Sequence, residues 1–187
     1  MELNTLDPSK LRVNFIDVAS PLTWDEYFMF QAMLASYKSK DPSTKVGCVF
    51  VDKNNHQITM GYNGAVAGIK EADMPWGNDR SVPYEFQKYG YVIHSEANAI
   101  MHRHASLEGS RGYVTLFPCN ECAKLIATQK VSEIIYLADK YRETPEIKVS
   151  KKIFDMAGVK FRKLEMSESL VKKLGVYLLG LLAEANV

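Results

Sequence analysis

The sequence predicts an α/β fold: a three-layer α/β/α domain with a mixed five-stranded sheet. Two observations support this class. An early pair of strand-like runs reads as a hairpin, and helical and strand-like segments then alternate to the end of the chain. The length of 187 residues and the 47% hydrophobic content suit one globular domain with a substantial core. We therefore expect helices on both faces of the sheet.

The first predicted element is a helix. Thr23-Trp24-Asp25-Glu26 is a capping box, in which Glu26 follows the Thr23 cap by three residues. The helix should run to about Ser39, because Asp41-Pro42 stops it. Four of its residues can face a core at helical spacing: Tyr27, Phe28, Leu34 and Ala35.

A β-hairpin and a long connection follow. The apolar run Val46–Val51 contains Cys48, which we expect to be a buried strand residue. The turn signal Asn54-Asn55 separates it from the alternating run Gln57–Tyr62. The irregular segment from residue 63 to about 91 is long for a compact domain, and such loops are often functional. Its aromatic residues favour an ordered lid or wall.

The remaining pattern alternates regularly. We expect helices over 94–104, 119–128, 147–157 and 167–183, with strands over 113–116, 133–137 and 159–164. Gly158 is placed as the C′ residue of the third of these helices. The chain therefore divides into an N-terminal tail (1–21), a central domain (22–164) and a C-terminal helix (165–187) that packs on the domain or at an oligomer interface.

Charge and targeting signals are weak. The net charge is +1, and basic residues are interspersed with acidic ones, which argues against a nucleic-acid partner. The longest mostly apolar stretch, Leu174–Ala183, is too short to span a membrane. The first residues lack a secretory signal, and three cysteines agree with a reducing compartment. We therefore expect a cytoplasmic protein.

Two short motifs carry the chemistry. His94-Ser95-Glu96 supplies an imidazole and a carboxylate, and Pro118-Cys119-Asn120-Glu121-Cys122 supplies two thiolates. One histidine and two cysteines can hold Zn²⁺ with the fourth position open, which is typical of a catalytic site. H-x-E combined with P-C-x-x-C is the signature of zinc-dependent deaminases, with the glutamate as proton carrier.

Simpler explanations exist for each part taken alone. Cysteines are among the most buried residue types, and a lone C-x-x-C can be a redox pair. An isolated histidine is more often a hydrogen-bonded core residue than a ligand. The combined spacing favours zinc ligands His94, Cys119 and Cys122, with Glu96 as the catalytic acid–base group.

Further strings make the chain resemble the deoxycytidylate (dCMP) deaminases of the cytidine deaminase superfamily. The resemblance runs from about Trp24 to Lys163. Its most specific stretches are Lys40–Gly47, Gly61–Gly64, Pro75-Trp76, Leu116–Ile126, Asp139–Tyr141 and Phe154–Val159. Ser95 departs from the family, which usually has alanine there; a small side chain still fits, so we expect little effect. The long loop has no cysteine, so the second zinc site of some phage relatives is not expected.

The resemblance implies a cytidine deaminase-like fold and further site residues. Asn63 would hold the sugar hydroxyl, although Asn-Gly is also a common turn pair. Tyr141 would line the nucleotide site, although it can equally be a plain surface residue. Ser43 and Lys45 are the candidates for phosphate contacts. The resemblance also implies Zn²⁺ as the cofactor, with Mg²⁺ accompanying a regulatory nucleoside triphosphate.

The leading functional interpretation is hydrolytic deamination of dCMP to dUMP and ammonia, supplying dUMP for thymidylate synthesis. The alternatives are a deaminase for cytidine, guanine or tRNA adenosine, or a non-catalytic regulatory member of the fold. The resemblance also implies a homo-oligomer, favouring a hexamer, under allosteric control by dCTP and dTTP. Independently, the leucines of the C-terminal helix exceed one apolar stripe, which fits either an interface or intrachain packing.

Overall fold

The computed structural model describes residues 22–185, which fall into two units. Trp24–Leu164 forms the larger unit, and the smaller contains the helix α5 (Glu168–Ala185). The segment 1–21, expected to be a tail, lies outside the described residues. Within the described residues, no helix is long and apolar enough to cross a membrane.

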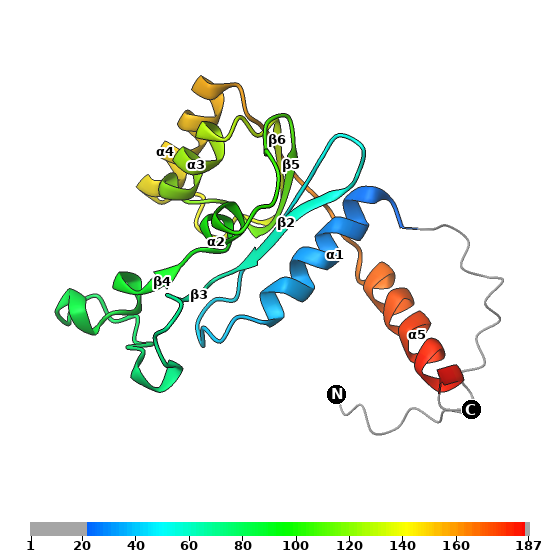
Figure 1. The fold of residues 1–187 in the computed structure, drawn as a ribbon, viewed down its shortest axis with the longest axis horizontal. Coiled ribbons are helices and arrows are strands. Elements are labelled where there is room, and N and C mark those ends of the chain that lie inside the picture. The colour runs from blue at the N-terminus through cyan, green and yellow to red at the C-terminus, as the bar shows by residue number, and fades with distance from the viewer. Residues whose placement is uncertain (1–21, 186–187) are drawn as a thin grey trace. The chain divides into compact units, whose positions relative to one another are not determined.

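The larger unit is built on a mixed five-stranded sheet (Figure 1). In spatial order its strands are β2 (Gln57–Tyr62), β1 (Gly47–Val51), β5 (Arg111–Leu116), β6 (Glu133–Ala138) and β7 (Lys160–Lys163). β1 is antiparallel to both of its neighbours, whereas β5, β6 and β7 run parallel. The predicted fold class and the predicted hairpin are therefore confirmed.

Helices cover both faces of this sheet. They are α1 (Trp24–Tyr37), α2 (Ser95–Met101), α3 (Asn120–Thr128) and α4 (Pro145–Ala157). Gly47 of β1 lies against α1, where a Cβ would overlap the carbonyl oxygen of Ala32. Gly61 of β2 lies against α2, where a Cβ would overlap the carbonyl oxygen of Ser95. The two helices therefore approach opposite faces at positions that only glycine allows, and Figure 1 shows α3 and α4 beside α2.

The close approach of α1 decides which of its residues are buried. Phe28 and Ala35 face the sheet as predicted, but Tyr27 and Leu34 are 42% and 72% exposed. Small side chains are needed where the helix backbone lies on Gly47, so alanines occupy the buried face. Hydrophobicity alone therefore selected the wrong face for Leu34.

The main core lies between the sheet and α2, α3 and α4. Cys48 is fully buried in it, as predicted, next to Phe50 and Val114. α4 begins two residues before its predicted start, because Thr144 caps it through the Ile147 N–H and Pro145 is its first residue. It ends at Gly158, whose φ of 72° is the left-handed conformation expected for that glycine.

The long connection is ordered by several short elements. These are β3 (Gly64–Ala65), β4 (Val92–Ile93) and three 3₁₀ turns, Glu71–Asp73 (η4), Tyr84–Phe86 (η5) and Lys88–Gly90 (η6). β3 and β4 pair antiparallel and form a separate two-stranded sheet. The backbone N–H of Lys88 donates to the Gly77 carbonyl at 2.9 Å, which joins the two ends of the intervening segment 78–87. This segment forms one wall of the cavity described below.

Candidate active site

The two chemical motifs stand at the beginnings of two helices. His94 is the residue immediately before α2, and Cys119 is the residue immediately before α3, each with extended backbone. Cys122 lies in the first turn of α3. The sequence placed His94 and Cys119 inside the helices, whereas the structure places them as the caps. The positive ends of both helix dipoles therefore lie beside the thiol groups.

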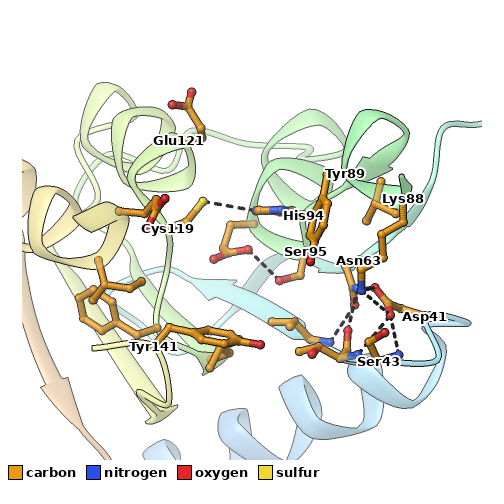
Figure 2. Close-up of a pocket in the computed structure, with 18 of the residues that line it drawn as sticks. Asp41, Ser43, Asn63, Lys88, Tyr89, His94, Ser95, Cys119, Glu121 and Tyr141 are labelled. Atoms are coloured by element: carbon orange, nitrogen blue, oxygen red, sulfur yellow. Dashed lines mark hydrogen bonds and ion pairs between the residues drawn. The ribbon is translucent and has the colours of Figure 1, made fainter. Parts of the chain in front are cut away.

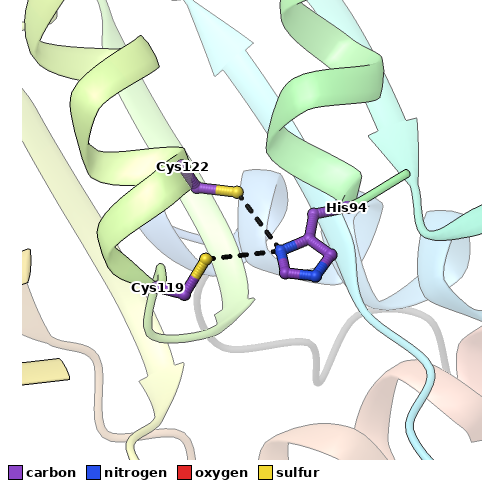
Figure 3. A group of neighbouring side chains, drawn as sticks. All are labelled: His94, Cys119 and Cys122. Carbon is purple, nitrogen blue, oxygen red and sulfur yellow. Dashed lines mark hydrogen bonds between the residues drawn. The ribbon is translucent and has the colours of Figure 1, made fainter. Parts of the chain in front are cut away.

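The three side chains converge on one point (Figure 3). The Nδ1 atom of His94 is 3.4 Å from the Sγ atom of Cys119 and 3.5 Å from that of Cys122, and the three atoms lie within 4.8 Å of one another. Tetrahedral zinc with ordinary Zn–N and Zn–S lengths separates its nitrogen and sulfur ligands by about 3.6 Å. The donor set and its spacing fit a zinc ion with three protein ligands.

The protonation state of these three side chains is also suited to binding a metal cation. A hydrogen bond from the Cys122 thiol, assisted by His94, lowers the pKa of Cys119 to about 4. The hydrogen bond with Cys119 raises the pKa of His94 to about 9. The bond to Cys119, with burial, raises the pKa of Cys122. The triad thus holds one thiolate and two protons, and a bound metal ion takes the place of such protons.

Glu96 lies beside the triad and is nearly inaccessible to solvent. Its side chain is 4% exposed, and the Ser95 hydroxyl donates to its Oε2 atom at 2.9 Å. Burial raises the pKa of Glu96. A carboxyl group with a raised pKa, next to a metal triad, can both accept and return a proton near neutral pH.

One side of a cavity of about 450 Å³ is lined by His94, Ser95, Glu96 and Cys119. This volume is within the usual size for a small-molecule site. The other walls come from the loop between α1 and β1, the segment 78–92 and the loop between β6 and α4. Figure 2 shows Cys119 at one end and Asp41, Ser43 and Lys88 at the other. The cavity therefore has a metal end and a polar end.

A buried ion pair organises the polar end. The Lys88 ammonium donates to both carboxylate oxygens of Asp41 at 2.8 Å, and the two residues are 6% and 2% exposed. Asp41 also accepts the backbone N–H groups of Ser43 and Thr44 and the amide of Asn63. Burial raises the pKa of Asp41, but the bonds from Lys88 and these N–H groups outweigh it and hold that pKa below 3.8.

Asn63 completes this network. Its Oδ1 accepts the Val46 N–H at 2.8 Å, and its amide donates to the Thr44 carbonyl at 2.9 Å as well as to Asp41. Asn63 is therefore a brace between β2 and the loop before β1, and it also lines the cavity. Its Oδ1 retains a second lone pair for a further donor.

The other residues predicted to contact the nucleotide do not all line the cavity. Ser43 and Tyr141 line the cavity. Lys45 does not: its ammonium lies 5.6 Å from the centre of the Tyr37 ring on α1. Because residues 41–46 are held by Asp41 and Asn63, Ser43 is turned to the cavity and Lys45 away from it. We therefore remove Lys45 from the set of candidate phosphate contacts.

Sequence reasoning missed most of the polar end. Lys88, Asn78, Arg80 and Tyr89 all line the cavity, and all four come from the long connection. Their positions depend on how that connection folds, and no motif marks them. The only usable signal was its length with its aromatic content, which predicted a wall without naming its residues.

Comparison with known proteins agrees with this geometry. The family model described as the cytidine and deoxycytidylate deaminase zinc-binding region matches residues 22–138. The deoxycytidylate deaminase of Homo sapiens is 43% identical over 143 residues, covering 76% of this chain and 80% of that protein. A probable deoxycytidylate deaminase of Drosophila melanogaster is 43% identical over 147 residues, covering 76% and 72%.

A solved structure is similar over the same part of the chain. The dCMP deaminase from the cyanophage S-TIM5, in complex with dCMP and dUMP, is 29% identical with a TM-score of 0.58. The match covers 74% of this chain and 95% of that chain.

Proposed function

The chain belongs to the cytidine and deoxycytidylate deaminase family, and on this premise we propose that it converts dCMP and water to dUMP and ammonia. The observation that carries the proposal is the convergence of His94, Cys119 and Cys122 at zinc-ligand spacing, with Glu96 beside them in a nucleotide-sized cavity. The dUMP formed is a precursor for thymidylate synthesis.

The metal end performs the chemistry. His94, Cys119 and Cys122 would hold the zinc ion, which would supply a Lewis acid that lowers the pKa of water to about 7. Glu96 takes the proton from the attacking water and delivers it to N3 of the cytosine ring, which makes C4 electrophilic. The water oxygen bonds to C4, and Glu96 then takes the proton of the resulting C4 hydroxyl and passes it to the amino group. The C4–N bond breaks, ammonia leaves, and the C4 carbonyl of dUMP forms. The Ser95 hydroxyl orients the carboxylate through its bond to Oε2.

The polar end binds the rest of the nucleotide. Asn63 uses its remaining Oδ1 lone pair to accept a sugar hydroxyl, and its bonds to Val46 and Thr44 fix that atom in place. Tyr141 stands on the loop between β6 and α4 and supplies an aromatic wall. Ser43 is the phosphate contact retained from the sequence. These roles are supported by the residues' place in the cavity and by the family resemblance.

A substrate panel tests the proposal. Ammonia release from dCMP should exceed that from deoxycytidine, CMP and a tRNA anticodon stem by well over tenfold, which is about 1.4 kcal/mol of transition-state discrimination. A preference for the nucleoside or the RNA would overturn the substrate and leave the zinc chemistry standing. No release from any substrate would favour the non-catalytic alternative.

Assembly, regulation and location form a separate part of the proposal. The resemblance supports a cytoplasmic hexamer controlled by dCTP, with Mg²⁺, and by dTTP. No described residue of α5 is buried, and several of its leucines are exposed, which supports an interface on this helix. Light scattering should give a mass several times 21 kDa, with sigmoidal dCMP kinetics. A monomer with hyperbolic kinetics, indifferent to both triphosphates, would contradict it.

A further inference from the structure

We propose that Arg80, with Asn78 and Ser43, binds the 5′-phosphate and makes the enzyme select nucleotides over nucleosides. This inference rests on the proposed function, because it assigns the phosphate of dCMP to named residues. A phosphate group at neutral pH carries between one and two negative charges, and an arginine guanidinium is well shaped to bind it with paired hydrogen bonds.

The choice of Arg80 follows from the charges around the cavity. Apart from His94 of the metal triad, the described residues that line it include two cations, Arg80 and Lys88. Lys88 is buried and already donates to both oxygens of Asp41, so its charge is neutralised within the protein. Arg80 is exposed, and within the described residues it has no carboxylate partner. It is therefore the cation with charge available for an anionic ligand.

Arg80 is also oriented by its surroundings. Its guanidinium carbon lies 5.0 Å from the centre of the Tyr89 ring, and Tyr89 itself lines the cavity. Packing of a guanidinium on an aromatic ring restrains the group while leaving its N–H edge able to donate. The Lys88–Gly77 hydrogen bond closes the intervening segment and keeps Arg80 near Tyr89. Arg80 is thus held at the cavity before any ligand enters.

Asn78 and Ser43 place polar groups on the same wall. The Asn78 amide donates to the Ser43 Oγ at 3.3 Å, which joins the long connection to the loop after α1. Because that hydroxyl acts as an acceptor, its own proton can donate to a ligand oxygen. The Ser43 backbone N–H is used by Asp41, so the side chain is the part of Ser43 that reaches the phosphate. Ser43 lies at the polar end, away from Cys119 (Figure 2).

The test compares dCMP with deoxycytidine in the zinc-loaded Arg80→Ala variant. We expect kcat/KM for dCMP to fall about 10- to 100-fold, the range for losing charge-assisted hydrogen bonds, with kcat/KM for deoxycytidine unchanged. Arg80→Lys should give an intermediate loss, since it keeps the charge but not the paired donors. Arg103→Ala, which removes an exposed arginine outside the cavity lining, should leave both values unchanged.

Three outcomes would overturn the inference. An equal loss for both substrates would assign Arg80 a structural role, and an unchanged dCMP value would remove it from the phosphate site. In both cases the wild-type preference for dCMP would still support the proposed function. A wild-type enzyme without that preference would overturn both together.

Discussion

The metal end and the polar end of the cavity are built in different ways. At the metal end, the candidate ligands and Glu96 come from two short motifs at the beginnings of α2 and α3, and few residues separate the members of each motif. At the polar end, Asp41, Asn63, Lys88 and Tyr141 come from three separate connections spread over 100 positions. The first end depends on helix geometry, and the second depends on a buried ion pair that holds loops together.

This difference predicts that the two ends fail differently when altered. Loss of a metal ligand should abolish chemistry while the fold remains, because the helices are anchored in the core through other residues. Loss of the Lys88–Asp41 pair should weaken the fold itself, because that pair joins the long connection to the loop before β1.

The largest effect is expected for Cys119→Ser. This change removes a soft ligand from the triad, so the zinc content should fall well below one per chain. Turnover of dCMP should fall by at least about 10³-fold, because Lewis-acid stabilisation is worth several kcal/mol. Elemental analysis and an ammonia assay would check both. Cys48→Ala is the matched control, since it removes a buried cysteine outside the triad and should keep its zinc. Normal zinc in Cys119→Ser would show that the metal is held elsewhere.

The next effect is expected for Lys88→Met. Without its cation, the Asp41 carboxylate is buried and unpaired, so the free energy of unfolding should fall by about 3–5 kcal/mol. Lys130→Met breaks an exposed pair with Glu108 and should cost less than about 1 kcal/mol. Urea denaturation of both variants measures the contrast. Equal losses would mean that burial of the Lys88 pair has no special weight.

The smallest effect is a dependence of stability on pH at Asp41. Its pKa in the folded protein lies below 3.8, so its contribution is complete above that value and is lost as the pH falls through the folded pKa. The difference in unfolding free energy between wild type and Asp41→Asn should be constant near neutral pH and shrink below about pH 4. A difference that stays constant on acidification would show that the Asp41 charge does not stabilise the fold.

The same contrast explains how much the sequence could predict. His94, Glu96, Cys119 and Cys122 lie in two local motifs whose spacing matches the chemistry proposed for them, and the structure places the four residues close together. The sheet was equally predictable from the sequence, because apolar runs of strand length alternate with helical segments. Element ends moved by a few residues where capping decided them, as at Thr144.

The polar end was not predictable because its contacts are long-range. Lys88 meets Asp41 across 47 positions, and only the folded connection makes them neighbours. Lys45 was selected for its charge, but the bracing of its loop directs it to Tyr37 instead. Leu34 was assigned to the core for its hydrophobicity, whereas the tight approach of α1 to Gly47 places Ala32 and Ala35 on the buried face and leaves Leu34 exposed. Composition does not encode these distances.

Measuring zinc content and dCMP turnover together in Glu96→Gln tests the central claim, that the metal is held by the triad while Glu96 moves the proton. The glutamine keeps the shape and a hydrogen-bonding group but cannot carry a proton. We predict about one zinc per chain, as in wild type, and turnover reduced about 10²- to 10⁴-fold. Near-normal turnover with zinc retained would assign the proton transfer to another group. Loss of the zinc would make Glu96 part of the metal site, and either result would contradict the account.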